Sequence, residues 1–263
     1  MGDFVLALGD EELKPGVNYW KSYTTAAGAL MEFTVNNKPA REGAWKIRVT
    51  PVSGQQLGNL QYDRWVDERR TLTNKLSGGD IGYLHIRQMN EPALRQFERD
   101  LASNRTKKAL IIDQRFNPGG NIDQELLAIL GQKQYQKTKV RDAIEATRPM
   151  RGYFSPMVVL ANERSTSDAE VFPDGFRTLK LGKVVGVTTY GAVIGTGAHR
   201  LMDGSSIRTP GSGLWNVDGT NLENYGVRPD VYVDIRPEEY FAGRDPQLEK
   251  AVEVLREQLT SRK

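Results

Sequence analysis

The chain has 263 residues, of which 38% are apolar and 26% are charged, and this globular composition argues against a coiled coil, a collagen-like chain or long disorder. Its 36 basic residues exceed the 33 acidic ones by three and are scattered along the chain, so no basic stripe indicates a nucleic-acid partner. The absence of cysteine excludes disulfides, thiolate zinc sites and a cysteine nucleophile.

The first 52 residues are predicted to form a small module of strands and one short helix. A module with so few elements buries little apolar surface by itself, so it should pack against the following part of the chain or against a segment outside it. An amphipathic helix is expected at 58–76 and should end at Ser77-Gly78-Gly79. The elements expected in the module are 4–8, 18–25, 30–35 and 45–52.

Strands and helices alternate from about residue 78 onward, and this order predicts a single layered α/β domain. The run 109–112 is continuously apolar, as in a strand covered on both faces. Asp203-Gly204 predicts a hairpin turn. Strands are expected at 81–86, 109–113, 157–161 and 184–187, and helices at 91–103, 123–131, after Ser167 and at 247–258.

Two loops follow apolar strands and open into helices, which presents backbone N–H groups at the carboxyl end of a sheet. The first contains Gly119 and Gly120, whose small size suits an oxyanion hole, although a plain tight turn is the commoner use of a glycine pair. The second contains Ser165, Thr166 and Ser167 at the start of a helix. The helix dipole there favours a nucleophile, but a helix-capping role is commoner, and three hydroxyls leave the choice open.

Several motifs together carry a resemblance to a known family. Residues 113–120 match D-x-R-x-N-x-G-G, Ser167-Asp168 matches an S-D nucleophile motif, and residues 223–230 match E-N-x-G-V-x-P-D. Residues 243–248 also match the C-terminal tail of the same family. In this order over residues 78–255, the motifs make the chain resemble the S41 serine peptidases, and within them the tricorn-like branch.

The resemblance implies a role for each matched residue. Ser167 would be the nucleophile, the N–H groups of Gly120 and Asp168 the oxyanion donors, and Glu223 the carboxylate that orients the catalytic base. Gly119 is the alternative to Gly120, because a glycine pair leaves the register open. These are the residue types that acyl transfer needs, and no metal or organic cofactor is expected.

The fold implied by the resemblance is α/β: a ClpP/crotonase-like spiral of ββα units, preceded by a partial PDZ-like β module. It divides the chain into the partial PDZ-like module at 1–56, a helical linker at 57–77 and the peptidase domain at 78–263. The partial module resembles only the second half of a tricorn-type PDZ domain. The chain is therefore expected to be part of a longer protein.

The catalytic base is missing from the positions where the family carries it. Processing peptidases have a lysine in T-F-G-K, whereas residues 189–192 here read Thr-Tyr-Gly-Ala. Tricorn-like peptidases have a histidine ahead of the PDZ domain, but His85 and His199 both lie in the later α/β part, where each is interpreted as a structural strand residue. Their separation also argues against zinc. The base is therefore expected upstream of this chain, which alone should have little activity.

The expected activity is that of a serine endopeptidase or carboxypeptidase-type hydrolase acting on peptides, assembled as a homo-oligomer, with no nucleic acid and no membrane span. A cytoplasmic location is expected because no signal peptide or long apolar run is present, and an extracytoplasmic one stays open because the true start is expected upstream. Two other classes stay open: a catalytically silent peptide-binding or scaffold protein on the same fold, and a crotonase-like acyl-transfer enzyme acting on thioesters.

Overall fold

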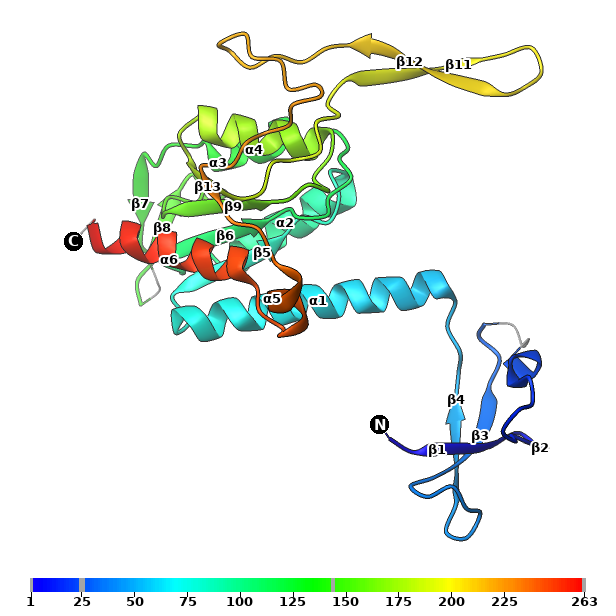
Figure 1. The fold of residues 1–263 in the computed structure, drawn as a ribbon. Coiled ribbons are helices and arrows are strands. Elements are labelled where there is room, and N and C mark those ends of the chain that lie inside the picture. The colour runs from blue at the N-terminus through cyan, green and yellow to red at the C-terminus, as the bar shows by residue number, and fades with distance from the viewer. Residues whose placement is uncertain (1, 24–26, 143–144, 262–263) are drawn as a thin grey trace. The chain divides into compact units, whose positions relative to one another are not determined.

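A computed structural model describes residues 2–23, 27–142 and 145–261 (Figure 1). Its contacts divide the chain into two compact units, Met1–Trp65 and Val66–Lys263. The helix α1 (Gly54–Ser77) runs from the end of the first unit into the second. The predicted helix at 58–76 lies within it, and the predicted three-part division at 56 and 77 stays a prediction.

The first unit is a four-stranded antiparallel sheet in the order β2-β1-β3-β4. The predicted segment 18–25 contains a 3₁₀ helix (Tyr19–Tyr23), and residues 24–25 lie outside the described residues. Trp45, Ile47 and Val49 alternate along β4 and are each about 40% exposed, as expected of a module with few elements. The strands are β1 (Phe4–Leu8), β2 (Glu11–Glu12), β3 (Met31–Asn36) and β4 (Trp45–Val49).

The second unit is built on a five-stranded sheet in the order β13-β10-β9-β6-β5, in which all neighbours are parallel. The four predicted strands and the predicted α/β class are confirmed, and β13 adds a short edge strand that the sequence pattern did not indicate. The strands are β5 (Ile81–His85), β6 (Ala109–Asp113), β9 (Met157–Ala161), β10 (Gly182–Gly186) and β13 (Val231–Tyr232).

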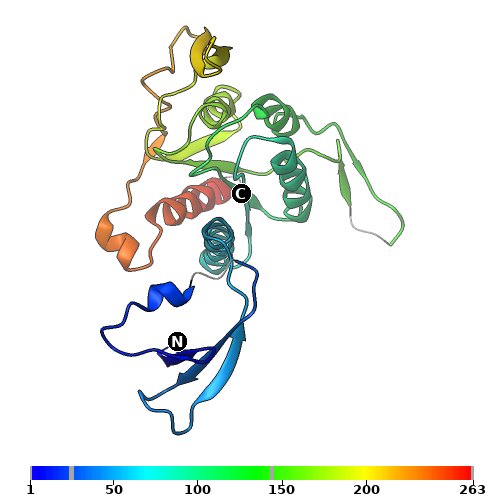
Figure 2. The same cartoon turned by 90° about the vertical axis from the view of Figure 1, so that its right-hand side faces the viewer.

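Helices of the second unit cover both faces of this sheet (Figures 1 and 2). Alternate strand residues face opposite cores: Ile112 points toward the core that includes Phe97 and Phe172, and Ile111 toward the one that includes Leu248. The first core is shared with α2 (Glu91–Ser103), α3 (Asp123–Leu130) and α4 (Asp168–Thr178), and the second with α6 (Pro246–Ser261) and the end of α1.

Two hairpins and a short helix complete the second unit. The first hairpin pairs β7 (Gln136–Thr138) with β8 (Ala146–Arg148), and the second pairs β11 (Gly195–Arg200) with β12 (Ser206–Ser212), closing at the predicted Asp203-Gly204 turn. The helix α5 (Pro237–Phe241) precedes α6. Within the described ranges, every helix is too short or too polar to cross a membrane.

Candidate active site

Ser167 lies at the sharp turn between β9 and α4 and has an unusual backbone conformation. Its φ and ψ are 58° and −125°, a left-handed region that costs a residue with a side chain about 1–3 kcal/mol. The two neighbouring hydroxyls are otherwise engaged. The buried Ser165 Oγ donates to the Gln114 carbonyl and accepts from the Asn162 N–H, and Thr166 Oγ1 donates to the Arg164 carbonyl. The conformation therefore singles out Ser167 among the three hydroxyls.

The glycine bend after β6 packs directly against this turn. A Cβ placed on Gly119 would lie 2.7 Å from the Cβ of Ser167 and 2.6 Å from the Thr166 carbonyl oxygen. A Cβ on Gly120 would lie 1.7 Å from the Met89 carbonyl oxygen. Both glycines also have positive φ, of 93° and 151°. Glycine is therefore required at both positions, by close approach and by backbone conformation.

In the serine turn and the glycine bend, the backbone N–H groups of Asp168 and Gly120 have no acceptor among the residues that the structure describes. The Gly119 N–H, in contrast, donates to Asn117 Oδ1 at 2.9 Å. A buried N–H group without an acceptor is rare in folded proteins, and Asp168 is buried, whereas Gly120 is exposed; both N–H groups can therefore serve as donors to a bound ligand. This geometry favours Gly120 over the alternative Gly119 in the predicted pair of donors.

Glu170, in the first turn of α4, organises the surroundings of Ser167. Its carboxylate is fully buried and accepts four hydrogen bonds. One comes from the Ser167 N–H at 3.1 Å, and three come from the segment 189–192, including the Thr189 hydroxyl at 2.6 Å. Glu170 therefore fastens this segment to the serine turn.

Glu223 binds the two residues that follow this segment, Val193 and Ile194. Its Oε2 accepts from the N–H groups of Val193 and Ile194, both at 2.8 Å, and its side chain is partly exposed. The Asn224 N–H donates to the Gly191 carbonyl at 2.7 Å. Hydrogen bonds thus link Glu223 to the Ser167 turn through the segment 189–194 and Glu170, and among the described residues no hydrogen bond joins the Glu223 and Ser167 side chains directly.

In the described part of the chain, the hydrogen bonds of Ser167 involve neither histidine. His85 ends β5 with its Nδ1 4.0 Å from Asp113, and burial lowers its pKa to about 4. His199 is exposed in β11, opposite Ile207. The place where processing peptidases carry a lysine is held by Ala192, whose N–H donates to Glu170. Over the described part of the chain, no three acidic or histidine side chains converge to hold a metal ion.

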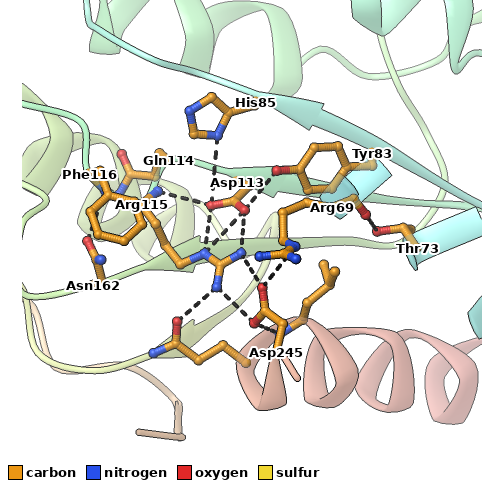
Figure 3. Close-up of polar contacts among 12 residues, drawn as sticks. Arg69, Thr73, Tyr83, His85, Asp113, Gln114, Arg115, Phe116, Asn162 and Asp245 are labelled. Carbon is orange, nitrogen blue, oxygen red and sulfur yellow. Dashed lines mark hydrogen bonds and ion pairs between the residues drawn. The ribbon is translucent and has the colours of Figure 1, made fainter. Parts of the chain in front are cut away.

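Two predicted motif residues, Asp113 and Arg115, lie in a buried network instead of the site (Figure 3). The Arg115 guanidinium donates to Asp113 at 2.7 Å and to Asp245 at 2.9 and 3.0 Å. Burial alone would raise the pKa of Asp113, and Arg115 beside it brings that pKa below its ordinary value. The Tyr83 hydroxyl and the Gln247 side chain complete the network.

Comparison with known proteins shows the family to which the chain belongs. Residues 80–233, more than half of the chain, match the sequence profile of peptidase family S41. The chain belongs to this family. The S41 chain is 34% identical to tricorn protease homolog 1 of Streptomyces coelicolor over 95% of its length, and 35% identical to the tricorn protease of Thermoplasma acidophilum over 76%. It superimposes on the crystal structure of the tricorn protease with a TM-score of 0.86 at 30% identity, over 98% of the chain.

These relatives are much longer than the chain. It spans 23% of the Streptomyces protein, 19% of the Thermoplasma protein and 25% of the tricorn chain in the crystal structure. The comparison therefore shows the S41 family and the fold of this part. It confirms the predicted resemblance and the predicted α/β fold.

Reasoning from the sequence missed two residues of the S41 site. Asn117 was noted only as part of a motif, yet its buried side chain accepts from the Gly119 N–H and donates to the Ile86 carbonyl, which shapes the bend. Glu170 lies two positions after the Ser167-Asp168 motif, which assigns it no role. The spacing Ser-x-x-Glu at the start of a helix is a capping-box pattern, and this signal predicts a contact between Glu170 and the Ser167 backbone.

Proposed function

We propose that this S41 chain carries the nucleophile of a serine peptidase, with Ser167 forming the acyl-enzyme. The observation that carries the proposal is the left-handed Ser167 turn, packed against a glycine bend, with N–H groups on Gly120 and Asp168 that have no acceptor among the described residues. A nucleophile on a strained turn between a strand and a helix has its hydroxyl presented at the edge of the sheet. Family membership supports the same chemistry.

In the proposed reaction, the Ser167 oxygen attacks the carbonyl carbon of a peptide bond while a general base takes the hydroxyl proton. The negative charge that develops on the carbonyl oxygen is held by the N–H groups of Gly120 and Asp168. Collapse of the intermediate breaks the C–N bond, and the amine leaves with a proton from the base. Water then attacks the acyl-enzyme ester, releases the acid and restores the serine.

The general base is proposed to be a histidine from outside these 263 residues. His85 is buried against Asp113, His199 is on an exposed hairpin, and Ala192 stands where a lysine would be. Glu223 is proposed to orient the incoming base with Oε1, because its Oε2 is already bound to the backbone of 193–194. The homo-oligomer and the cytoplasmic location stay predictions.

The experiment uses the full-length protein and a fluorophosphonate, which labels an activated serine. We expect labelling at Ser167 by mass spectrometry, and S167A should lower peptide turnover by at least about 10³-fold. T166V, which removes the neighbouring hydroxyl, is the matched control and should keep turnover within a few-fold. If S167A cleaves peptides at the parent rate, the proposal is wrong. A protein that binds peptides but neither cleaves them nor takes the label would be the catalytically silent alternative.

A further inference from the structure

Asp168 contributes to the site twice, once with its backbone and once with its side chain. Its N–H is one of the two without an acceptor among the described residues. Asp168 is buried, with 7% of the residue exposed. Its carboxylate turns toward α3, where Oδ2 accepts from the N–H groups of Ile122 at 2.7 Å and Asp123 at 3.1 Å. The side chain therefore connects the first residue of α4 to the start of α3.

The segment that Asp168 holds is the one that carries Gly120. On the near side of this bend, the Thr166 N–H donates to the Asn117 carbonyl at 3.0 Å. On the far side, the Asp168 carboxylate holds Ile122 and Asp123. Thr166 and Asp168, the residues immediately before and after Ser167, thus form hydrogen bonds with the two ends of the glycine bend. A third attachment, between Met89 and the bend, is made by strand-like hydrogen bonds and does not involve the serine turn.

We propose that the Asp168 side chain is a positioning residue, which sets the separation of the Gly120 and Asp168 N–H groups by tethering the glycine bend to the serine turn. This inference rests on the proposed function. Oxyanion stabilisation depends on donors that are already in place, and a displacement of about 1 Å can lower the rate by about 10²-fold. The same residue then provides one donor with its backbone and holds the other with its carboxylate.

A second carboxyl faces this tether. Asp123, at the start of α3, is close enough to Asp168 to share a hydrogen bond, and burial together with this neighbour raises the pKa of Asp168 to about 7. The hydrogen bonds from the backbone N–H groups of Ile122 and Asp123 lower this pKa. Near neutral pH the pair can therefore hold one proton between its carboxyls, while the Asp168 Oδ2 still accepts from both N–H groups.

The test compares D168A and D168N in the full-length protein, with E125Q as the matched control. Glu125 is an exposed acidic residue in the same first turn of α3. We expect D168A to lower kcat by about 10²-fold with KM changed less than about threefold, because the substrate still binds to a site with displaced donors. D168N keeps an oxygen acceptor, so it should recover part of the loss. E125Q should keep the parent kcat.

A transition-state analogue separates positioning from general instability. A peptide aldehyde forms a hemiacetal with the serine and places an oxygen between the two donors, so D168A should weaken its inhibition by about 10²-fold, while the affinity for the cleaved product peptide stays near that of the parent. Active-site titration reports the fraction of folded sites, so kcat is compared per intact site even if D168A folds poorly.

The outcomes also distinguish this inference from the proposed function. If S167A is inactive while D168A and D168N keep the parent kcat per site and the parent inhibition by the aldehyde, the positioning role is wrong and the nucleophile stands. If S167A is fully active, the proposed function has failed, and the positioning role fails with it. A loss in D168A that D168N does not relieve at all would also overturn the tether.

Discussion

Glu170 shows how one buried carboxylate can hold a reactive turn in place. Its four hydrogen bonds reach the Ser167 N–H and three groups of the segment 189–192. Hydrogen bonds to a charged acceptor contribute about 1.5–3 kcal/mol each, so they can offset the cost of the left-handed Ser167 conformation. The same segment reaches Glu223 through Val193 and Ile194. Glu170 is therefore the connection between the proposed nucleophile and the proposed orienting carboxylate.

Replacing Glu170 should accordingly affect both folding and activity. In E170Q an amide NH₂ would face a backbone N–H, which leaves at least one buried donor without an acceptor at a cost of about 1–3 kcal/mol. We expect a lower free energy of unfolding by about that amount, measured with urea, and fluorophosphonate labelling of Ser167 at least about tenfold slower.

The control for this prediction is E163Q, since Glu163 is an exposed residue of the same loop. It should leave both the stability and the labelling rate near those of the parent. An E170Q protein with unchanged stability and unchanged labelling would show that the hydrogen bonds of Glu170 are dispensable.

At the scale of elements, the Arg115 network ties the end of β6 to the start of α6. Asp245 accepts from Arg115 and also caps α6 through the Leu248 N–H at 3.0 Å (Figure 3). Arg69 of α1 lies 3.6 Å from the same carboxylate. The network therefore joins the sheet to the two helices that cover one of its faces.

Removing the charge of Asp245 should destabilise the second unit strongly. D245N leaves the fully buried Arg115 with one fewer carboxylate, and breaking a buried ion pair costs about 3–5 kcal/mol. Urea unfolding is the measurement. E253Q removes an exposed partner of Lys250 on the same helix and should change the stability by about 1 kcal/mol or less. Equal stability of D245N and E253Q would mean that the network contributes little.

At the scale of the whole molecule, the Asp123–Asp168 pair makes stability depend on pH. Burial and the neighbouring Asp123 raise the pKa of Asp168 to about 7 in the folded state, above its ordinary value of 3.8, so the folded protein binds the proton more tightly than the unfolded one. This contribution is present at pH below about 4 and is lost as the pH rises through about 7.

The matched test measures urea unfolding between pH 5 and pH 8. The fall in stability across this range should be smaller in D168N, which cannot ionise at this position, and also in D123N, which lacks the neighbouring charge. His85 acts in the opposite sense: its pKa of about 4 means that stability decreases as the pH falls from about 6.5 toward 4, and because part of this change lies inside the window, the variants are compared with the parent, which carries the same histidine. A D168N protein with the same slope as the parent would contradict the shared proton.

The sequence alone was sufficient for much of the second unit. The alternation of apolar runs with amphipathic segments predicted the strands β5, β6, β9 and β10 and their helices, because strands covered on both faces must be continuously apolar. The motifs predicted the family. The edge strand β13 was missed, because two residues carry no periodicity.

Only the tertiary structure showed which motif residues lie in the buried Arg115 network and which lie at the serine turn. Arg115 and Asp245 are 130 positions apart, and no local pattern shows that they meet in a buried network. The resemblance assigned Ser167 and Gly120 from the sequence, and the structure supports this proposal with two local facts: the backbone angle of Ser167, and the Asn117 side chain that already accepts from the Gly119 N–H. Residue type and spacing record what the local backbone requires, whereas contacts between distant segments are set by how the chain packs.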